Sequence, residues 1–169
     1  MKNLIPVFTA ILMMVIFAST VKAQVTGTAT GTASIITPIT IAKTLDMNFG
    51  NIAVSPTIAG TVILAPAGTR TAGGGVTLPA SVGTVTVAQF TVSGLGTSTY
   101  SIVLPSTYTI TSGVNNMTVN AFTSTPSGTG ALTAGSQILK VGATLNVGAG
   151  QVAGTYTNAT GFPVIVNYN

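Results

Sequence analysis

The stretch that decides the fold is Gly154 to Tyr168, which reads GTYTNATGFPVIVNY. Its second half alternates between two rows of side chains. One row comprises Phe162, Val164, Val166 and Tyr168, and the other comprises Pro163, Ile165 and Asn167. A period of two residues is typical of a β-strand, whose side chains point alternately to opposite faces. The pattern predicts a strand that ends at Tyr168, and we expect the rest of the protein to form a sandwich around it.

The same alternation recurs upstream, between turn signals spaced about ten residues apart, and no helical period of useful length is found. The expected strands are Ile39 to Phe49, Thr61 to Leu64, Val76 to Leu78, Val82 to Val92, Tyr100 to Leu104, Tyr108 to Ile110, Met117 to Phe122 and Ile138 to Val147. Ala121 and Phe122 are expected to form a bulge or a switch between sheets, and residues 66–75 and 124–135 are expected to be loops. Many short strands imply a sandwich or barrel. We expect Phe90, Leu145, Val164 and Val166 to share one core.

Residues 1–23 resemble a cleavable signal peptide. Lys2 precedes an apolar run from Leu4 to Ala18, and Val21 and Ala23 fit the small-residue positions before a cleavage site. The apolar run is shorter than the roughly 20 residues that a membrane span needs. We therefore expect Gln24 to begin the mature protein, without a stable membrane anchor. Residues 24–169 are expected to form a single β-sandwich domain.

The start of the mature chain, Val25 to Ile36, reads VTGTATGTASII. Small and apolar residues form one row, which comprises Val25, Gly27, Ala29, Gly31, Ala33 and Ile35, and the other row is mostly threonine. Two interpretations stay open: a flexible tail whose last residues join the sheet, or a strand whose small side chains let its backbone approach closely inside a narrow groove. On the second interpretation, Val25, Ala29, Ala33 and Ile35 would pair with the row of Phe162, Val164, Val166 and Tyr168.

The composition excludes most catalytic chemistry. The whole chain has one acidic residue, Asp46, five basic residues, and no histidine or cysteine. Paired carboxylates, a Ser-His-Asp triad and a zinc site therefore cannot be built. We expect no enzyme activity, no cofactor and no metal site. The basic residues are not clustered, so nucleic acid is not an expected partner. Lys43 and Asp46 are expected to form a surface ion pair of small energetic value.

Several motifs together resemble a known family. They are Thr37-Pro-Ile-Thr-Ile41, Leu45-x-x-x-Phe49-Gly50, Phe90-Thr-Val-Ser-Gly94, Tyr100-Ser-Ile102, Val141-Gly-Ala-Thr-Leu145, Gly154-Thr-Tyr156 and Val164-x-Val-Asn-Tyr168. Their order and spacing resemble the bacterial domain of unknown function family 4402. The last block is also similar to spore coat protein U domains and to chaperone–usher pilins. The resemblance implies an immunoglobulin-like two-sheet β-sandwich with no established catalytic residues. Pro163 departs from the family pattern and predicts an open or bulged edge.

The expected function follows from these points together. In the similar pilins, the C-terminal strand lines a groove that the N-terminal extension of the next subunit fills. The resemblance therefore implies a non-enzymatic, secreted structural or surface protein, pilin-like or fimbrial, that assembles by strand complementation with itself or with other pilin-like subunits. The expected location is the periplasm, the cell surface or the medium. The alternative is a self-contained secreted binding module, for carbohydrate or surface adhesion, whose N-terminal strand pairs within the same molecule.

Overall fold

The computed structural model describes residues 24–169, in two units, residues 24–35 and residues 36–169. The expected signal peptide lies outside the described residues. Residues 24–35 carry no helix or strand and are exposed throughout. Val25 is 92% exposed and Ile35 is 100% exposed. The strict alternation of this stretch therefore corresponds to no strand in the structure.

Residues 36–169 contain strands and no helix. The strands are β1 (Thr40–Leu45), β2 (Asn48–Phe49), β3 (Ala53–Val54), β4 (Gly60–Leu64), β5 (Arg70–Gly74), β6 (Val76–Thr77), β7 (Val85–Thr86), β8 (Ala88–Ser93), β9 (Thr99–Val103), β10 (Thr107–Ser112), β11 (Asn115–Thr125), β12 (Thr129–Ala131), β13 (Ser136–Val147) and β14 (Ile165–Tyr168). All pairs of strands are antiparallel. The predicted all-β class is confirmed.

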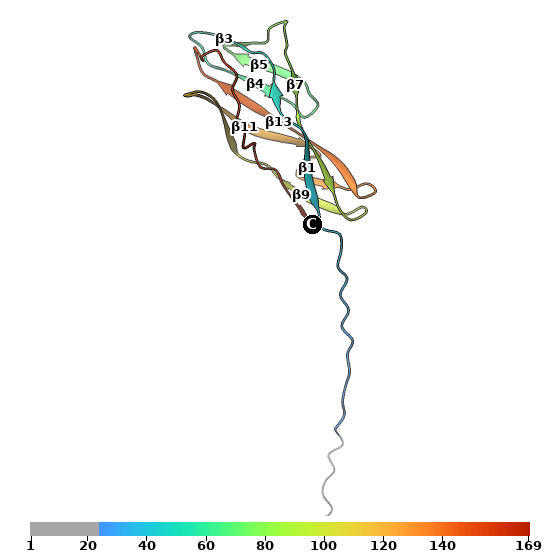
Figure 1. Ribbon diagram of the computed structural model, residues 1–169. Helices are drawn as coiled ribbons and strands as arrows, with labels where there is room; N and C mark the ends of the chain where they lie inside the picture. Colours follow the sequence, from blue (N-terminus) through green and yellow to red (C-terminus); the bar gives the residue numbers. More distant parts are fainter. Residues whose placement is uncertain (1–23) are drawn as a thin grey trace, which may run out of the picture. The chain divides into compact units, whose positions relative to one another are not determined.

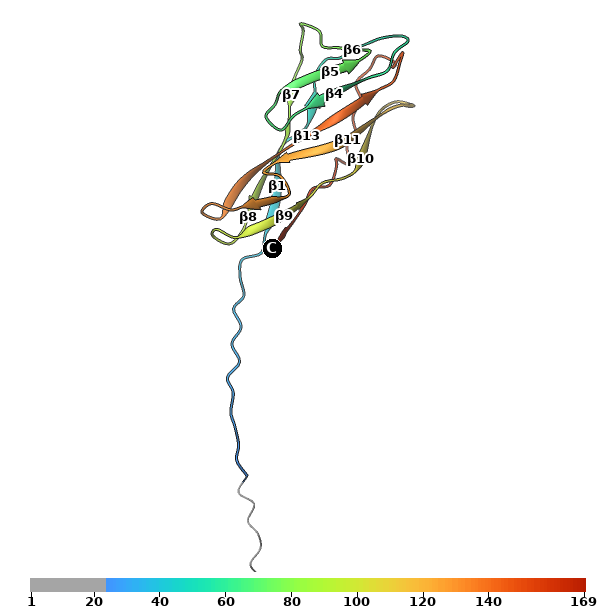
Figure 2. The ribbon, with the colours of Figure 1, turned by 180° about the vertical axis from the view of Figure 1, so that it is seen from behind.

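The strands form one large sheet and three small ones. The large sheet has the order β1-β8-β13-β11-β10, with β4 added beside β13 and β5 beside β4. A three-stranded sheet has the order β12-β9-β14, and β2-β7 and β3-β6 form two-stranded sheets. Strand β13 runs through the middle of the large sheet (Figures 1 and 2) because it pairs with β8, β11 and β4.

The central position of β13 follows from its sequence. Its predicted inner row is Leu139, Val141, Ala143, Leu145 and Val147, and all five side chains are buried. Ala88, Phe90 and Val92 of β8 are likewise buried, as predicted. Long strands with an apolar row bury most surface at the centre of a sheet, where both edges are also paired.

The interior is divided into two clusters, so the expectation of one shared core is wrong. Leu145 belongs to a cluster formed by β4, β11 and β13 with the small sheets. Phe90 and Val166 belong to a second cluster, against which Val164 packs. The second cluster joins the large sheet to the three-stranded sheet, which gives a sandwich-like arrangement. Met47 and Phe122 pack against both clusters. A continuous alternation along β13 could not show that its two halves face different partners.

Two predicted loops contain strands. Residues 66–75 include β5, which pairs with β4 from Gly60↔Gly74 to Leu64↔Arg70. Glycines are essential here, because a Cβ at Gly75 would overlap the carbonyl oxygen of Ile58 and Gly74 has φ +66°. A glycine run reads as a loop, although glycine also permits close approach of two backbones. Similarly, residues 124–135 include the end of β11 and all of β12.

The bulge in β11 is confirmed. The register between β11 and β13 shifts between Asn120 and Thr123, and Ala121 has φ 45°. The predicted strand from Val82 to Val92 is shorter than expected and is split into β7 and β8. The bulge turns β11, so its two halves align with different parts of β13.

Candidate functional site: the seam between β1 and β14

Strands β1 and β14, like the outer strands β5, β10 and β12, have one edge without a strand partner in residues 24–169. β1 pairs only with β8, and β14 pairs only with β9. These two free edges lie close to each other, but no ladder joins them within the described chain. We call the space between them the seam. An unpaired edge presents a row of N–H and C=O groups, so the seam offers templates for an added strand on both sides.

One end of the seam is held by Tyr168. The Tyr168 hydroxyl accepts a hydrogen bond of 2.6 Å from the Leu95 N–H and donates one of 2.9 Å to the Thr37 carbonyl. Gly94 makes room for this hydroxyl, since a Cβ there would overlap it. The aromatic residue at the end of the chain therefore ties the backbone that precedes β1 to the C-terminal strand.

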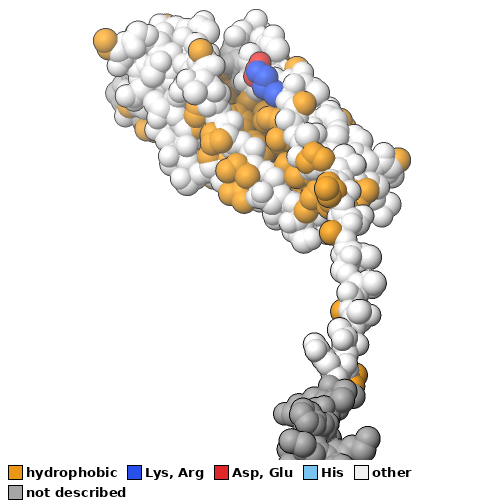
Figure 3. Space-filling model, turned by 60° about the horizontal axis from the view of Figure 1, so that its bottom comes forward, with side chains coloured by type: hydrophobic (Ala, Val, Ile, Leu, Met, Phe, Trp, Pro, Cys, Tyr) orange, Lys and Arg blue, Asp and Glu red, His pale blue; other side chains and the backbone are white. Residues whose placement is uncertain are grey.

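Hydrophobic side chains line this region without being fully buried. The half-buried residues that pack against the second cluster include Ile39, Ile41, Ile102, Leu104, Phe162 and Val164. The ring of Phe162 lies 5.0 Å from Phe122, 5.6 Å from Tyr108 and 6.5 Å from Phe90, centroid to centroid. Figure 3 shows hydrophobic side chains gathered in a band between polar rims, with the Lys–Asp pair at one end. An exposed hydrophobic band of this kind is typical of an interaction surface.

A charged side chain occupies the inner row of β1. Ile41 pairs with Val92 and Lys43 pairs with Phe90. Directly opposite residues of an antiparallel pair point to the same face, so Lys43 is on the side of the buried Phe90. Its ammonium lies 2.5 Å from Asp46, and the two side chains are 56% and 78% exposed. The predicted surface ion pair is therefore present, and Lys43 places it on the edge strand β1, beside the hydrophobic band.

The sequence pattern of a domain of unknown function, DUF4402, matches residues 39–168. The chain belongs to the DUF4402 family. The match begins one residue before β1 and ends at the last residue of β14, so both edges of the seam lie inside the DUF4402 domain and residues 24–38 lie outside the match. No curated protein and no solved structure matches the chain.

The two predicted halves of the pairing site belong to different units of the chain. In the C-terminal half of the DUF4402 domain, Phe162, Val164 and Tyr168 are half-buried and Val166 is 9% exposed, whereas the residues between them are exposed. The predicted inner row is therefore correct. The strand itself begins only at Ile165, after Pro163, because proline cannot donate to a ladder. Val25, Ala29, Ala33 and Ile35 belong to the other unit, residues 24–35, where they are exposed.

Sequence reasoning missed the other side of the seam. The alternation of Ile39, Ile41 and Lys43 marks β1 as a strand, but a lysine in the inner row weakens the signal for a buried face. A lysine on an edge strand is one of the devices that limit unwanted pairing. A lysine in an otherwise apolar row was therefore the feature of the sequence that could have identified β1 as an edge strand.

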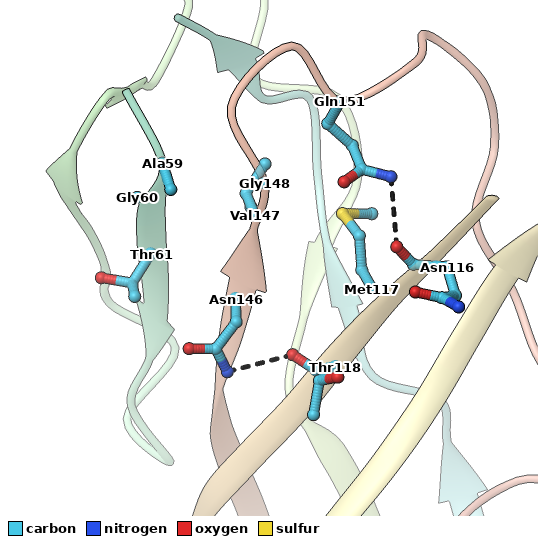
Figure 4. A pocket seen from close by; sticks show the side chains of 10 residues that line it. All are labelled: Ala59, Gly60, Thr61, Asn116, Met117, Thr118, Asn146, Val147, Gly148 and Gln151. Carbon is cyan, nitrogen blue, oxygen red and sulfur yellow. Dashed lines mark hydrogen bonds between the residues drawn. The ribbon is translucent and has the colours of Figure 1, made fainter. Parts of the chain in front are cut away.

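A second hollow lies on the DUF4402 domain between β4, β11 and β13 (Figure 4). Its lining carries amides and hydroxyls and no charged group, with Asn116, Asn146 and Gln151 prominent. The Asn146 amide donates to the Thr118 carbonyl at 3.1 Å, and the Gln151 amide donates to the Asn116 carbonyl at 3.2 Å. These donors are already used within the protein, so the hollow has few free groups for a ligand.

None of the residues that the structure describes lies in a helix long and apolar enough to cross a membrane.

Proposed function

We propose that this DUF4402 protein is a non-enzymatic, secreted structural protein of the cell surface. On this proposal its sandwich is immunoglobulin-like and pilin-like, and it is completed by addition of a β-strand at the seam. The observation that carries the proposal is the pair of unpaired edges, β1 and β14, on either side of a hydrophobic band. A strand added along one of these edges would satisfy its free backbone groups, beside half-buried hydrophobic side chains that include Ile41 and Val164.

The side-chain chemistry favours a structural role over a catalytic one. Asp46 is the only carboxylate side chain of the sequence, and there is no histidine or cysteine. Lys43 holds that carboxylate. General acid–base or nucleophilic catalysis requires at least one further group to act as the base. Strand addition requires only main-chain hydrogen bonds and pockets for alternate side chains.

Amide hydrogen exchange of the secreted protein over a range of concentrations, together with sizing, tests the proposal. We expect the amides on the free edges of β1 and β14 to gain protection as concentration rises, in step with formation of oligomers. The edge strand β5, which pairs only with β4, is the control and should not change. Fast exchange at β1 and β14 at every concentration, in a protein that stays monomeric, would contradict strand addition.

A second candidate is a self-contained binding module. The observation that favours it is the presence of a hollow between β4, β11 and β13 (Figure 4), although the amide donors that line it are already used within the protein. In that case the N-terminal segment would pair with β14 in the same molecule. The expected readout is protection of β1 and β14 that does not depend on concentration. Tyrosines offer little support for a carbohydrate platform, since Tyr100 is fully buried and the Tyr156 and Tyr168 hydroxyls donate to backbone carbonyls.

A further inference from the structure

We propose that residue 24 of the mature protein is pyroglutamate, formed by closure of the N-terminal glutamine on itself, and that this cap protects the N-terminal segment, residues 24–35, from aminopeptidases. Residue 24 lies outside residues 39–168, which match the DUF4402 pattern, so the cap is a property of this chain's own N-terminal segment. It goes beyond the proposed function and does not depend on addition of a strand at β1 or β14.

The modification follows from the chemistry of an N-terminal glutamine. Cleavage after Ala23 gives Gln24 a free α-amine. A bond forms between the α-nitrogen and the side-chain carbon Cδ, which closes a five-membered lactam ring. The bond between Cδ and the side-chain nitrogen breaks, and that nitrogen leaves as ammonia with one proton from the α-amine. No oxidant, reductant or co-reactant is consumed, and the reaction is favoured because both reacting groups belong to one residue.

The structure leaves Gln24 accessible for this reaction. Gln24 is exposed, and no helix or strand includes any residue of the N-terminal segment. The next side chain, that of Val25, is 92% exposed. The segment belongs to a different unit from residues 36–169, which contain all the strands. Ring closure therefore requires no part of the sandwich to open.

The cap removes a charge from a stretch that has no other. An α-amino group is mostly protonated at neutral pH, whereas the nitrogen of a lactam is a neutral amide. Residues 24–42 contain no lysine, arginine, aspartate or glutamate, so the α-amine would be the only charged group before Lys43. After closure the chain begins with an uncharged stretch, and the side chains of Lys43 and Lys140 are the primary amines of the mature protein.

The open end of the segment is its main point of attack by common proteases. Residues 24–42 contain no lysine, arginine or aromatic residue, so proteases with trypsin-like or chymotrypsin-like specificity have no preferred site there. Exposed chain ends without ordered structure are nevertheless readily degraded. An aminopeptidase acting on a free α-amine could remove the segment residue by residue until it reached Pro38 or the ladder of β1. Pyroglutamate presents no free amine to such an enzyme, so the segment is retained.

Intact-mass analysis and amine labelling of the secreted protein test the cap. We expect the mass of residues 24–169 less one ammonia, and labelling by an amine-reactive reagent at Lys43 and Lys140 only. The matched control is Gln24→Asn, whose side chain is one methylene shorter and cannot close the five-membered ring by this route. It should keep the full mass and carry a further label on its α-amine. A full mass with a labelled Gln24 amine would overturn the proposal, and so would a mature protein that begins at any other residue.

Digestion with an aminopeptidase tests the protective role. The natural protein should keep its mass, whereas Gln24→Asn should lose residues progressively from position 24 toward Pro38. Treatment of the natural protein with pyroglutamyl aminopeptidase, which removes the cap, should make it as sensitive as the variant. Thermal denaturation should give the same melting temperature before and after shortening, which would show that the sandwich stays folded. Equal shortening of the natural protein and Gln24→Asn, without removal of a cap, would overturn protection.

Discussion

Phe90 connects the two layers of the second cluster. Its side chain is 9% exposed and contacts Phe162 in an edge-to-face arrangement. We expect Phe90→Ala to lower the free energy of unfolding by about 3–5 kcal/mol, the range for a large aromatic residue whose removal leaves a cavity. Chemical denaturation measures the change. Val114→Ala is the control, since Val114 is 97% exposed, and an equal effect of the two substitutions would show that Phe90 is not a core residue.

Tyr100 sets a limit on stability at alkaline pH. Burial raises the pKa of its phenol above the usual value, which means that the folded state favours the neutral form. The stabilisation is complete below the pKa of the unfolded chain, near 10, and is lost as pH rises through the higher pKa of the folded protein. We expect the free energy of unfolding to decline above about pH 10.

The double variant Tyr100→Phe/Tyr108→Phe is the control for this pH dependence, because burial also raises the pKa of Tyr108. Its stability should decline less steeply over the same range. The Gln137 oxygen that accepts from Tyr100 at 2.8 Å also accepts from the Ala131 N–H, so the variant leaves it with a partner. An unchanged slope would assign the alkaline loss to other groups.

At the scale of elements, the hairpin from β12 to β13 has a residue that does not suit its turn. Ala134 and Gly135 both have positive φ, 50° and 80°, between the mutual hydrogen bonds of Thr133 and Ser136. Such turns prefer asparagine followed by glycine. Because alanine is strained in this conformation, Ala134→Asn should stabilise the protein by about 1 kcal/mol in thermal or chemical denaturation. Ala153→Asn at an exposed position should have little effect, and destabilisation by Ala134→Asn would contradict the turn assignment.

The elements differ in how well the sequence predicted them. β13 and β8 were predicted correctly because a long row of valine, leucine and phenylalanine alternates with polar residues. β5 was missed because pairing of Gly60 with Gly74 uses only the backbone and leaves no side-chain pattern. β12 has three residues and consists of Thr, Gly and Ala, so its position depends on β9 rather than on its own preference. Short or glycine-rich strands are specified by their neighbours.

At the scale of the whole molecule, the two ends of the chain should act together. We expect Ala29→Asp to abolish oligomers while leaving the monomer's melting temperature unchanged, because a charge in the inner row of the segment cannot enter an apolar seam. Thr28→Asp changes the outer row and should be mild. Sizing and thermal denaturation of both variants measure these effects. Wild-type behaviour of Ala29→Asp in both measurements would show that the segment is only a tail.

The maturation of the protein is a second prediction at this scale. The exit sequence Val21-x-Ala23 should direct cleavage before Gln24. Intact-mass measurement of protein recovered from the periplasm or the medium is expected to give residues 24–169. Recovery of residues 1–23 with the protein in a membrane fraction would exclude this processing.

The sequence by itself determined the all-β class, the buried rows of β8 and β13, the bulge at Ala121 and the inner row from Phe162 to Tyr168. These features are local, because a period of two and a proline or bulge act within one strand. The sequence also contains no histidine or cysteine, which limits the catalytic and metal-binding chemistry open to the side chains. Only the tertiary structure decided that the core divides in two, that Lys43 lies opposite Phe90, and that β1 and β14 face each other without a ladder. Those relations depend on which strands meet, and residues more than a hundred positions apart, such as Thr37 and Tyr168, are brought together by the whole fold.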